Sequence, residues 1–180
     1  MKKTSVNADR QQGIEASVYA GCQGATAAFA RMEELMPLIQ ERLDAGQAVR
    51  LSPMGVSMLP MLREGRDSVV LTSPPSKLRR YDLPLYLRGD GKYILHRVVG
   101  IDGDEYICSG DNQIELERGV THGQIIAVVT EFTRGEKHHS VKGFGYWLYC
   151  RLWYYSRFPR RVWRGVRRRL GRLRRRIIKS

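Results

Sequence analysis

Short runs rich in Val, Ile and Tyr fill the middle of the chain, and they constrain the fold more than any other feature. Six of them are strand candidates by length and composition: residues 48–51, 68–72, 83–87, 93–99, 105–108 and 125–132. The connectors at 89–91 (Gly-Asp-Gly) and 102–104 (Asp-Gly-Asp) are typical of tight hairpin turns. Because no helical segment separates these runs, they predict an antiparallel sheet or a small closed barrel, not a parallel sheet with crossover helices.

A helical segment precedes the β-rich region. From residue 25 to residue 46 apolar residues recur at three- and four-residue steps: Phe29, Met32, Leu35, Met36, Ile39 and Leu43. This spacing predicts an amphipathic helix that Gly46 ends and that Pro37 kinks or divides in two. Residues 1–24 are small and polar and contain no apolar core of secretory-signal length, so we expect a mobile leader there.

The charge of the 180-residue chain is concentrated at one end. Residues 151–180 contain thirteen Lys or Arg and no Asp or Glu, whereas the other 150 residues hold 18 basic and 18 acidic side chains. The whole formal charge of +13 therefore lies in the tail. This asymmetry indicates a neutral β domain, expected at residues 47–134, that carries a separate anion-seeking segment at residues 135–180.

The tail has two parts. Aromatic residues and leucines crowd residues 144–158, and after Pro159 an apolar stripe recurs at helical spacing among arginines: Val162, Val166, Leu170, Leu173 and Ile177. Eleven of residues 160–179 are Arg or Lys, which excludes a membrane span. We expect residues 144–179 to lie on an anionic membrane surface, peripherally on the cytoplasmic face. Nucleic acid is the less favoured partner, because a continuous apolar stripe has no use on a phosphate backbone.

Ser57 and His96 are the candidate catalytic residues. Ser57 lies between a glycine and a proline in the sequence Gly-Val-Ser-Met-Leu-Pro, which favours a tight, exposed turn, and His96 lies within the apolar run 93–99. A serine hydroxyl attacks a peptide carbonyl only when a base within hydrogen-bond reach takes its proton. Histidine is the usual base, because its ordinary pKa leaves it mostly neutral at pH 7. The alternative for each residue alone is structural: a turn serine and a half-buried strand histidine.

Three blocks of sequence follow one another in the β-rich region. They are, in order, Gly55-Val56-Ser57-Met58-Leu59-Pro60 with the following run 62–70, then His96-Arg97-Val98-Val99-Gly100, and last Ser109-Gly110-Asp111-Asn112. In their order and spacing these blocks resemble the type I signal peptidase superfamily. The first looks like that family's nucleophile motif and the third like its Gly-Asp-Asn box. The second carries histidine where the common bacterial enzymes have lysine. Over roughly residues 48–132 the chain therefore resembles the serine–histidine branch, and more narrowly the small signal-peptidase-like proteins of Gram-positive anaerobes.

The resemblance extends to further site residues. It implies that Asp111 lies near the site, either orienting His96 or anchoring the turn that shapes the site. The branch often has another aspartate six residues later, and here Glu117 stands at that position, one methylene longer. The Ser57 amide is the first candidate donor to an oxyanion. Gly55 replaces the serine that supplies a second donor in some relatives, so a backbone group near Gly55 would serve instead, and Met58 is a further candidate for the oxyanion hole or the substrate groove.

These observations predict a serine endopeptidase with a signal-peptidase-like antiparallel β domain, an N-terminal helix and C-terminal basic amphipathic helices. Its substrates would be precursor peptides or leader segments, cut after small side chains and bound in extended form beside a strand edge. No cofactor or metal is expected. The alternative is a non-catalytic protein that binds an extended peptide with its β domain and docks on anionic lipid or nucleic acid with its tail.

Overall fold

A computed structural model describes residues 25–156 and residue 159. The predicted leader (residues 1–24), the side chain of Phe29 and the predicted basic helix (residues 160–179) lie outside what is described. In chain order the elements are α1 (Ala25–Asp44), β1 (Val49–Leu51), β2 (Asp67–Thr72), β3 (Pro84–Leu87), β4 (Tyr93–Leu95), β5 (Arg97–Asp102), β6 (Glu105–Ser109), β7 (Glu117–Thr121), the short 3-10 helix η1 (His122–Gln124), β8 (Ile125–Arg134), β9 (Lys137–Ser140) and α2 (Phe144–Tyr155).

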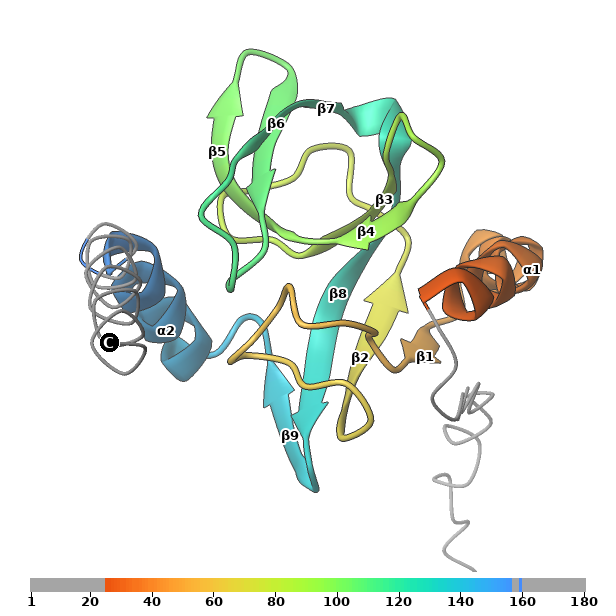
Figure 1. Ribbon diagram of the computed structural model, residues 1–180, viewed down its shortest axis with the longest axis horizontal. Coiled ribbons are helices and arrows are strands. Elements are labelled where there is room, and N and C mark those ends of the chain that lie inside the picture. Colours follow the sequence, from red (N-terminus) through yellow and green to blue (C-terminus); the bar gives the residue numbers. More distant parts are fainter. Residues whose placement is uncertain (1–24, 157–158, 160–180) are drawn as a thin grey trace, which may run out of the picture. The chain divides into compact units, whose positions relative to one another are not determined.

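The strands form two antiparallel sheets (Figure 1). The larger has the order β1-β2-β8-β3-β4, with β9 also paired to β8, and the smaller has the order β5-β6-β7. The ten-residue strand β8 is the central strand of the larger sheet, and it pairs with β2, β3 and β9 along its length. The predicted mainly antiparallel β architecture with an N-terminal and a C-terminal helix is therefore confirmed.

Both predicted hairpins are present. β3 and β4 pair across residues 88–92, and in the β5–β6 hairpin Asp102 pairs with Glu105 around the Gly103-Asp104 turn. Gly103 has a positive φ of 58°, a conformation that glycine adopts without steric cost. The turn chemistry of the sequence is therefore a reliable guide to these two connections.

The predicted strand 93–99 is wrong as a single element. The run breaks at His96 into β4, at one edge of the larger sheet, and β5, in the smaller sheet. Continuous apolar character could not reveal this break, because the residues on both sides of it are buried or half-buried. His96 consequently lies at the corner where the chain passes from one sheet to the other.

Two strands have no counterpart in the sequence prediction, β7 and β9. β7 contains Gly119, which has a φ of +76°. All four residues of β9 are exposed and polar or charged. Neither segment therefore shows the alternation of apolar and polar residues that predicts a strand. β9 nevertheless completes a hairpin with β8 around Gly135. The β domain thus does not end at residue 134 as predicted, and the compact unit that contains it extends to Gly143.

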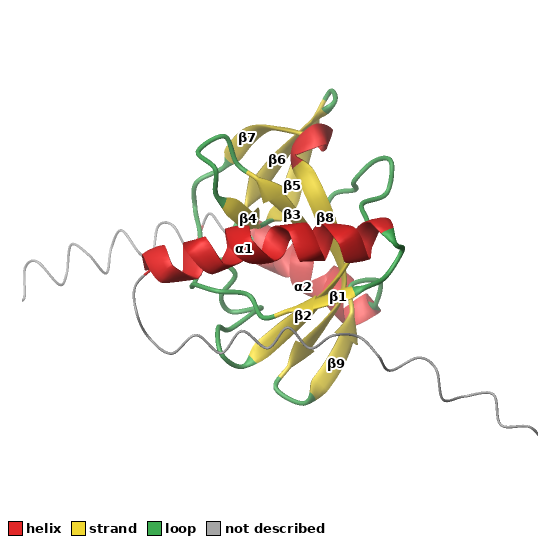
Figure 2. Ribbon diagram, turned by 90° about the vertical axis from the view of Figure 1, so that its right-hand side faces the viewer, coloured by secondary structure: helices red, strands yellow, loops and turns green. Residues whose placement is uncertain are grey.

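The helix α1 runs through Pro37 as one element, so the chain does not divide there. Its buried positions Met36, Ile39 and Leu43 follow the predicted apolar stripe. Gly46, at a φ of +72°, ends the helix, and the Leu43 carbonyl accepts hydrogen bonds from the Gly46 N–H at 2.9 Å and from the Ser73 hydroxyl at 2.8 Å. Figure 2 shows α1 passing in front of the strands of the β domain.

One apolar cluster joins the two sheets. It contains Leu78, Tyr86, Val98, Tyr106, Cys108, Val120, Ile125 and Val128, with Ile94 packed against it. Tyr86 comes from β3 in the larger sheet and Tyr106 from β6 in the smaller, and both rings are buried. Tyrosine needs a hydrogen-bond partner for its hydroxyl when it is buried, so each ring carries a polar group into this core.

The second compact unit begins at Phe144 with α2. Several of its large apolar side chains are exposed, among them Phe144 at 75%, Leu152 at 63% and Tyr155 at 67%. Cys108 and Cys150 are buried and are not joined in a disulfide bond. Within the described part of the chain, no helix combines the length and the apolar character that a membrane crossing requires.

Candidate functional site

Ser57 begins a turn in the connection between β1 and β2. Gly55, two residues earlier, has a φ of +79°, and its N–H donates to Glu64 Oε2 at 3.0 Å. The positive φ explains why glycine occupies this position. Because Glu64 accepts the hydrogen bond of the Gly55 N–H, a second oxyanion donor would have to come from another backbone group near Gly55.

The turn around Ser57 is joined directly to the segment 109–112. The Asn112 N–H donates to the Ser57 carbonyl at 2.8 Å, and Asn112 Nδ2 donates to the Val56 carbonyl at 3.2 Å. Gly110 lies so close that a Cβ atom on it would be 2.6 Å from the Ser57 carbonyl oxygen. The first and third sequence blocks are therefore in contact, and glycine at 110 is what allows the approach.

Arg97 belongs to the second sequence block, and its side chain contacts residues of the other two. Its guanidinium makes a two-pronged ion pair with Asp111, with Nε–Oδ1 and Nη2–Oδ2 distances of 2.8 Å each, and Nη2 also lies 2.8 Å from Met61 Sδ. The Arg97 and Asp111 side chains are only 2% and 3% exposed. Buried charges persist when they are paired in this way, so the Asp111 carboxylate serves to hold Arg97 and, through it, the corner at His96.

The His96 imidazole is contacted by side chains of two different strands. Its Nδ1 lies 3.3 Å from the hydroxyl of Tyr86 on β3 and 3.8 Å from Glu117 Oε2 at the start of β7. The Tyr86 hydroxyl itself donates to Glu117 Oε2 at 2.7 Å. The Glu117 carboxylate is thus near His96, and the Tyr86 hydroxyl contacts both the carboxylate and the imidazole.

Burial sets the protonation state of His96. The pKa of His96 is lowered to about 4, mainly because the imidazole is almost fully buried; the positive charge of Arg88 acts in the same direction and the negative charge of Asp111 in the opposite one. Since desolvation is the largest cause, His96 is neutral at neutral pH and has a lone pair for a proton.

The Tyr86 hydroxyl and the Cys108 thiol near this site stay neutral. Burial and the hydrogen bond to Glu117 raise the pKa of the Tyr86 hydroxyl, so it remains protonated. Burial raises the pKa of the Cys108 thiol to about 12, with a smaller contribution from Glu117. The cysteine is therefore not a thiolate nucleophile at neutral pH.

Ser57 and His96 are not hydrogen-bonded to each other: among the described residues, none of the hydrogen bonds involves the Ser57 hydroxyl or His96 Nε2. In the same residues no buried side-chain nitrogen or oxygen lacks a partner, so both of these atoms reach the surface. Catalytic hydrogen bonds are often long before substrate binds, so the missing contact does not exclude a role for the pair.

Two backbone donors next to Ser57 are available. In the part of the chain that is described, no hydrogen bond engages the N–H groups of Ser57 or Met58. Amides of a nucleophile and its neighbour can together bind the oxyanion of a tetrahedral intermediate. Beside the Ser57 N–H, the Met58 N–H is therefore the candidate second donor.

Sequence reasoning missed the roles of Tyr86 and Arg97. Arg97 follows His96 directly, and a basic residue in an otherwise apolar run is a signal of a buried ion pair. Tyr86 gives no such signal, because an aromatic residue in a strand is ordinary core packing.

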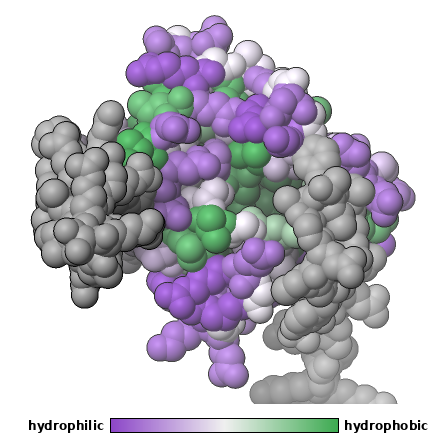
Figure 3. Space-filling view, viewed as in Figure 1, coloured by the Kyte–Doolittle hydropathy of each residue, from purple (hydrophilic) through white to green (hydrophobic). Residues whose placement is uncertain are grey.

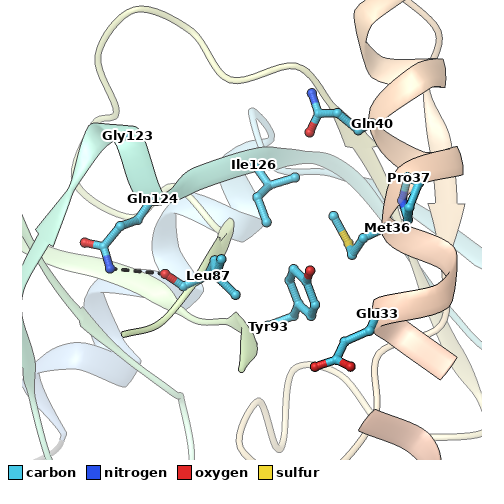
Figure 4. Close-up of a pocket in the computed structure, with 9 residues that line it drawn as sticks. All are labelled: Glu33, Met36, Pro37, Gln40, Leu87, Tyr93, Gly123, Gln124 and Ile126. Carbon is cyan, nitrogen blue, oxygen red and sulfur yellow. Dashed lines mark hydrogen bonds between the residues drawn. The ribbon is translucent and has the colours of Figure 1, made fainter. Parts of the chain in front are cut away.

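A separate open pocket of about 430 Å³ lies between α1 and the larger sheet (Figure 4). Its lining is mainly apolar, with Met36, Leu87 and Tyr93 pointing into it, and Glu33 is its one carboxylate. The dashed hydrogen bond runs from Gln124 Nε2 to the Leu87 carbonyl at 3.1 Å. Ser57 and His96 do not line this pocket.

No protein-family model matches the chain, and no curated protein sequence matches it. Among the described residues there is also no group of three or more His, Cys, Asp or Glu side chains that could hold a metal ion. The site must therefore be judged on its own geometry.

Proposed function

We propose that the chain is a serine endopeptidase of the signal peptidase type, with Ser57 as nucleophile and His96 as general base. The observation that carries this proposal is the meeting of three distant segments: the turn of Ser57, the corner at His96 and the turn 109–112, joined by Arg97, Asp111 and Asn112. A neutral histidine whose Nδ1 is hydrogen-bonded and whose Nε2 reaches the surface suits a base.

The reaction follows from these groups. Ser57 Oγ forms a bond to the peptide carbonyl carbon while its proton passes to His96 Nε2, and the N–H groups of Ser57 and Met58 bind the resulting oxyanion. The C–N bond then breaks and the leaving amine takes the proton from Nε2. Water repeats the sequence on the acyl-enzyme, giving its proton to His96 and releasing the carboxylic acid and the free Ser57 hydroxyl.

An extended peptide is the substrate class we propose. β4 forms one edge of the larger sheet and ends directly before His96, so a segment added beside this edge would run toward the base. Figure 3 shows apolar side chains gathered in a hollow near the middle of the face that it presents, with hydrophilic side chains above and below the hollow. Val56, 63% exposed beside the nucleophile, offers further apolar contact to a substrate.

The test is labelling and cleavage by the full chain. A fluorophosphonate probe should modify Ser57, as located by peptide mass mapping, and a library of peptides with small residues at the cleavage position should be cut. Ser57→Ala and His96→Ala should each abolish both signals, and the double variant should be scarcely worse, because residues that act as a unit give non-additive losses. Cleavage that survives in Ser57→Ala contradicts the proposal. Peptide binding without cleavage in the wild type supports the non-catalytic alternative.

We also propose that residues 144–179 hold the protein peripherally on an anionic membrane surface, on the cytoplasmic face. The exposed aromatic and leucine side chains of α2 support this, because such residues favour the boundary between water and lipid. The thirteen basic residues at 151–180 add attraction to anionic headgroups.

A further inference from the structure

The hydrogen bonds around His96 determine where its proton lies. A tyrosine hydroxyl has one proton to donate, and an ionised carboxylate can only accept. The Tyr86–Glu117 distance of 2.7 Å is that of a strong charge-assisted bond, whereas the Tyr86–His96 distance is 3.3 Å. The tyrosine proton therefore points at Glu117, and only lone pairs of the hydroxyl oxygen face the imidazole.

An oxygen lone pair can bind Nδ1 only if Nδ1 carries a proton. A neutral imidazole has a single N–H, so a proton on Nδ1 leaves Nε2 as the acceptor. Nε2 is the His96 nitrogen that reaches the surface and makes no hydrogen bond to a described residue. This tautomer is the one that a base for Ser57 requires.

We propose that Tyr86 is the positioning residue of the site: its hydroxyl relays the Glu117 carboxylate to His96 and holds the imidazole in the tautomer with a free Nε2. This inference rests on the proposed peptidase activity and deepens it. Tyr86 does not touch the substrate or the reacting atoms; it acts through His96. The Glu117 carboxylate thus acts on the imidazole through two hydrogen bonds, both made by the Tyr86 hydroxyl, instead of through one direct hydrogen bond.

The arrangement also responds to protonation of the base. When Nε2 takes the serine proton, the imidazolium keeps its Nδ1–H bond to the Tyr86 oxygen, and the Glu117 carboxylate lies 3.8 Å from the new positive charge. A fixed carboxylate near a developing charge in a buried site stabilises it without reorganisation. The tyrosine ring, packed edge-on to the imidazole at a centroid distance of 6.3 Å and fully buried, keeps the hydroxyl in place.

The chain offers a matched control in Tyr106. Its hydroxyl lies 3.1 Å from Nδ1 of His122 and accepts a hydrogen bond from the Leu78 N–H at 3.1 Å. Tyr106 belongs to the same buried cluster as Tyr86 but is not bonded to His96. Tyr106→Phe thus removes a buried tyrosine hydroxyl and a tyrosine–histidine bond without changing the proposed relay.

The experiment reads the histidine tautomer by long-range ¹⁵N–¹H NMR on the full chain labelled with ¹⁵N-histidine, with His96 assigned by its loss in His96→Gln. The wild type should carry the proton on Nδ1. In Tyr86→Phe the proton should move wholly or partly to Nε2, and kcat should fall at least tenfold, toward the roughly 10⁴-fold loss of a histidine base in the wrong tautomer, with KM little changed. Tyr106→Phe should change neither signal.

Glu117→Gln is the second variant, because it keeps a hydrogen-bond partner for Tyr86 but removes the charge. It should retain the Nδ1–H tautomer and lose kcat at least tenfold. A wild-type His96 with its proton on Nε2, or a folded Tyr86→Phe protein with unchanged tautomer and kcat, overturns the inference. If the expected tautomer is found but the wild type neither cleaves peptides nor labels at Ser57, the failure is that of the proposed activity.

Discussion

At the scale of the residue, the environment of His96 predicts an unusual pH dependence. With the pKa of His96 lowered to about 4 from its ordinary 6.5, peptide cleavage at low substrate concentration should persist well below pH 6 and fall only near pH 4. The groups that face or act on the imidazole are Tyr86 on β3, Arg88 directly after β3, Asp111 and Glu117. Measurement of kcat/KM against pH, corrected for the folded fraction, would contradict this if the acidic limb lay at 6.5.

The same shift has a consequence for stability. The unfolded chain binds a proton at His96 below about pH 6.5, whereas the folded chain binds it only near pH 4, so the free energy of unfolding decreases as pH falls through this window. The loss should reach about 3 kcal/mol at the acidic end. Urea unfolding between pH 4 and pH 7 measures it, and His96→Gln is the control, because its curve should lack this part of the decline.

Of the two candidate carboxylates, Asp111 should contribute mainly to stability and Glu117 mainly to catalysis. Asp111→Asn breaks a buried ion pair with Arg97, which should lower the free energy of unfolding by on the order of 3 kcal/mol or more. Glu117→Gln alters a partly exposed residue and should change stability far less while lowering kcat. Thermal unfolding and peptide cleavage, measured on both variants, check this. An Asp111→Asn protein of wild-type stability would mean that the ion pair does not support the fold.

At the scale of the element, the contact between the Ser57 turn and the turn 109–112 depends on Gly110. An alanine there would place its Cβ 2.6 Å from the Ser57 carbonyl oxygen, and neither partner can rotate away, because the obstacle is backbone. We expect Gly110→Ala to push the two turns apart and to lower kcat by at least tenfold. Gly89→Ala is the matched control, because its Cβ would meet no atom within 4 Å, and it should cleave like the wild type.

At the scale of the whole molecule, membrane attachment should depend on the tail alone. The intact chain should float with vesicles that contain phosphatidylserine, release them at high salt and ignore neutral vesicles. A version ending at Lys142 leaves out the second compact unit and should stay at the bottom of the gradient while still cleaving peptides. Flotation that truncation does not change, or binding of nucleic acid in preference to anionic vesicles, would refute the proposed anchor.

The sequence by itself determined the elements whose signal is local. The spacing of Met36, Ile39 and Leu43 predicted α1, and Gly103 and its neighbours predicted a hairpin, because helix periodicity and turn chemistry depend on residues close in the chain. The meeting of the blocks at Ser57, His96 and Asp111 was expected only through a resemblance.

Only the tertiary structure decided which partners these residues have. It paired Asp111 with Arg97, and it brought Tyr86 and Glu117 to His96 from strands β3 and β7, which the chain separates by three other strands. Local sequence could not predict these partners, because an Asp, Glu or Tyr residue looks the same in the sequence whichever buried group its side chain binds. The choice depends on sheet order and register, and those follow from long-range packing of β8 and the shared apolar cluster.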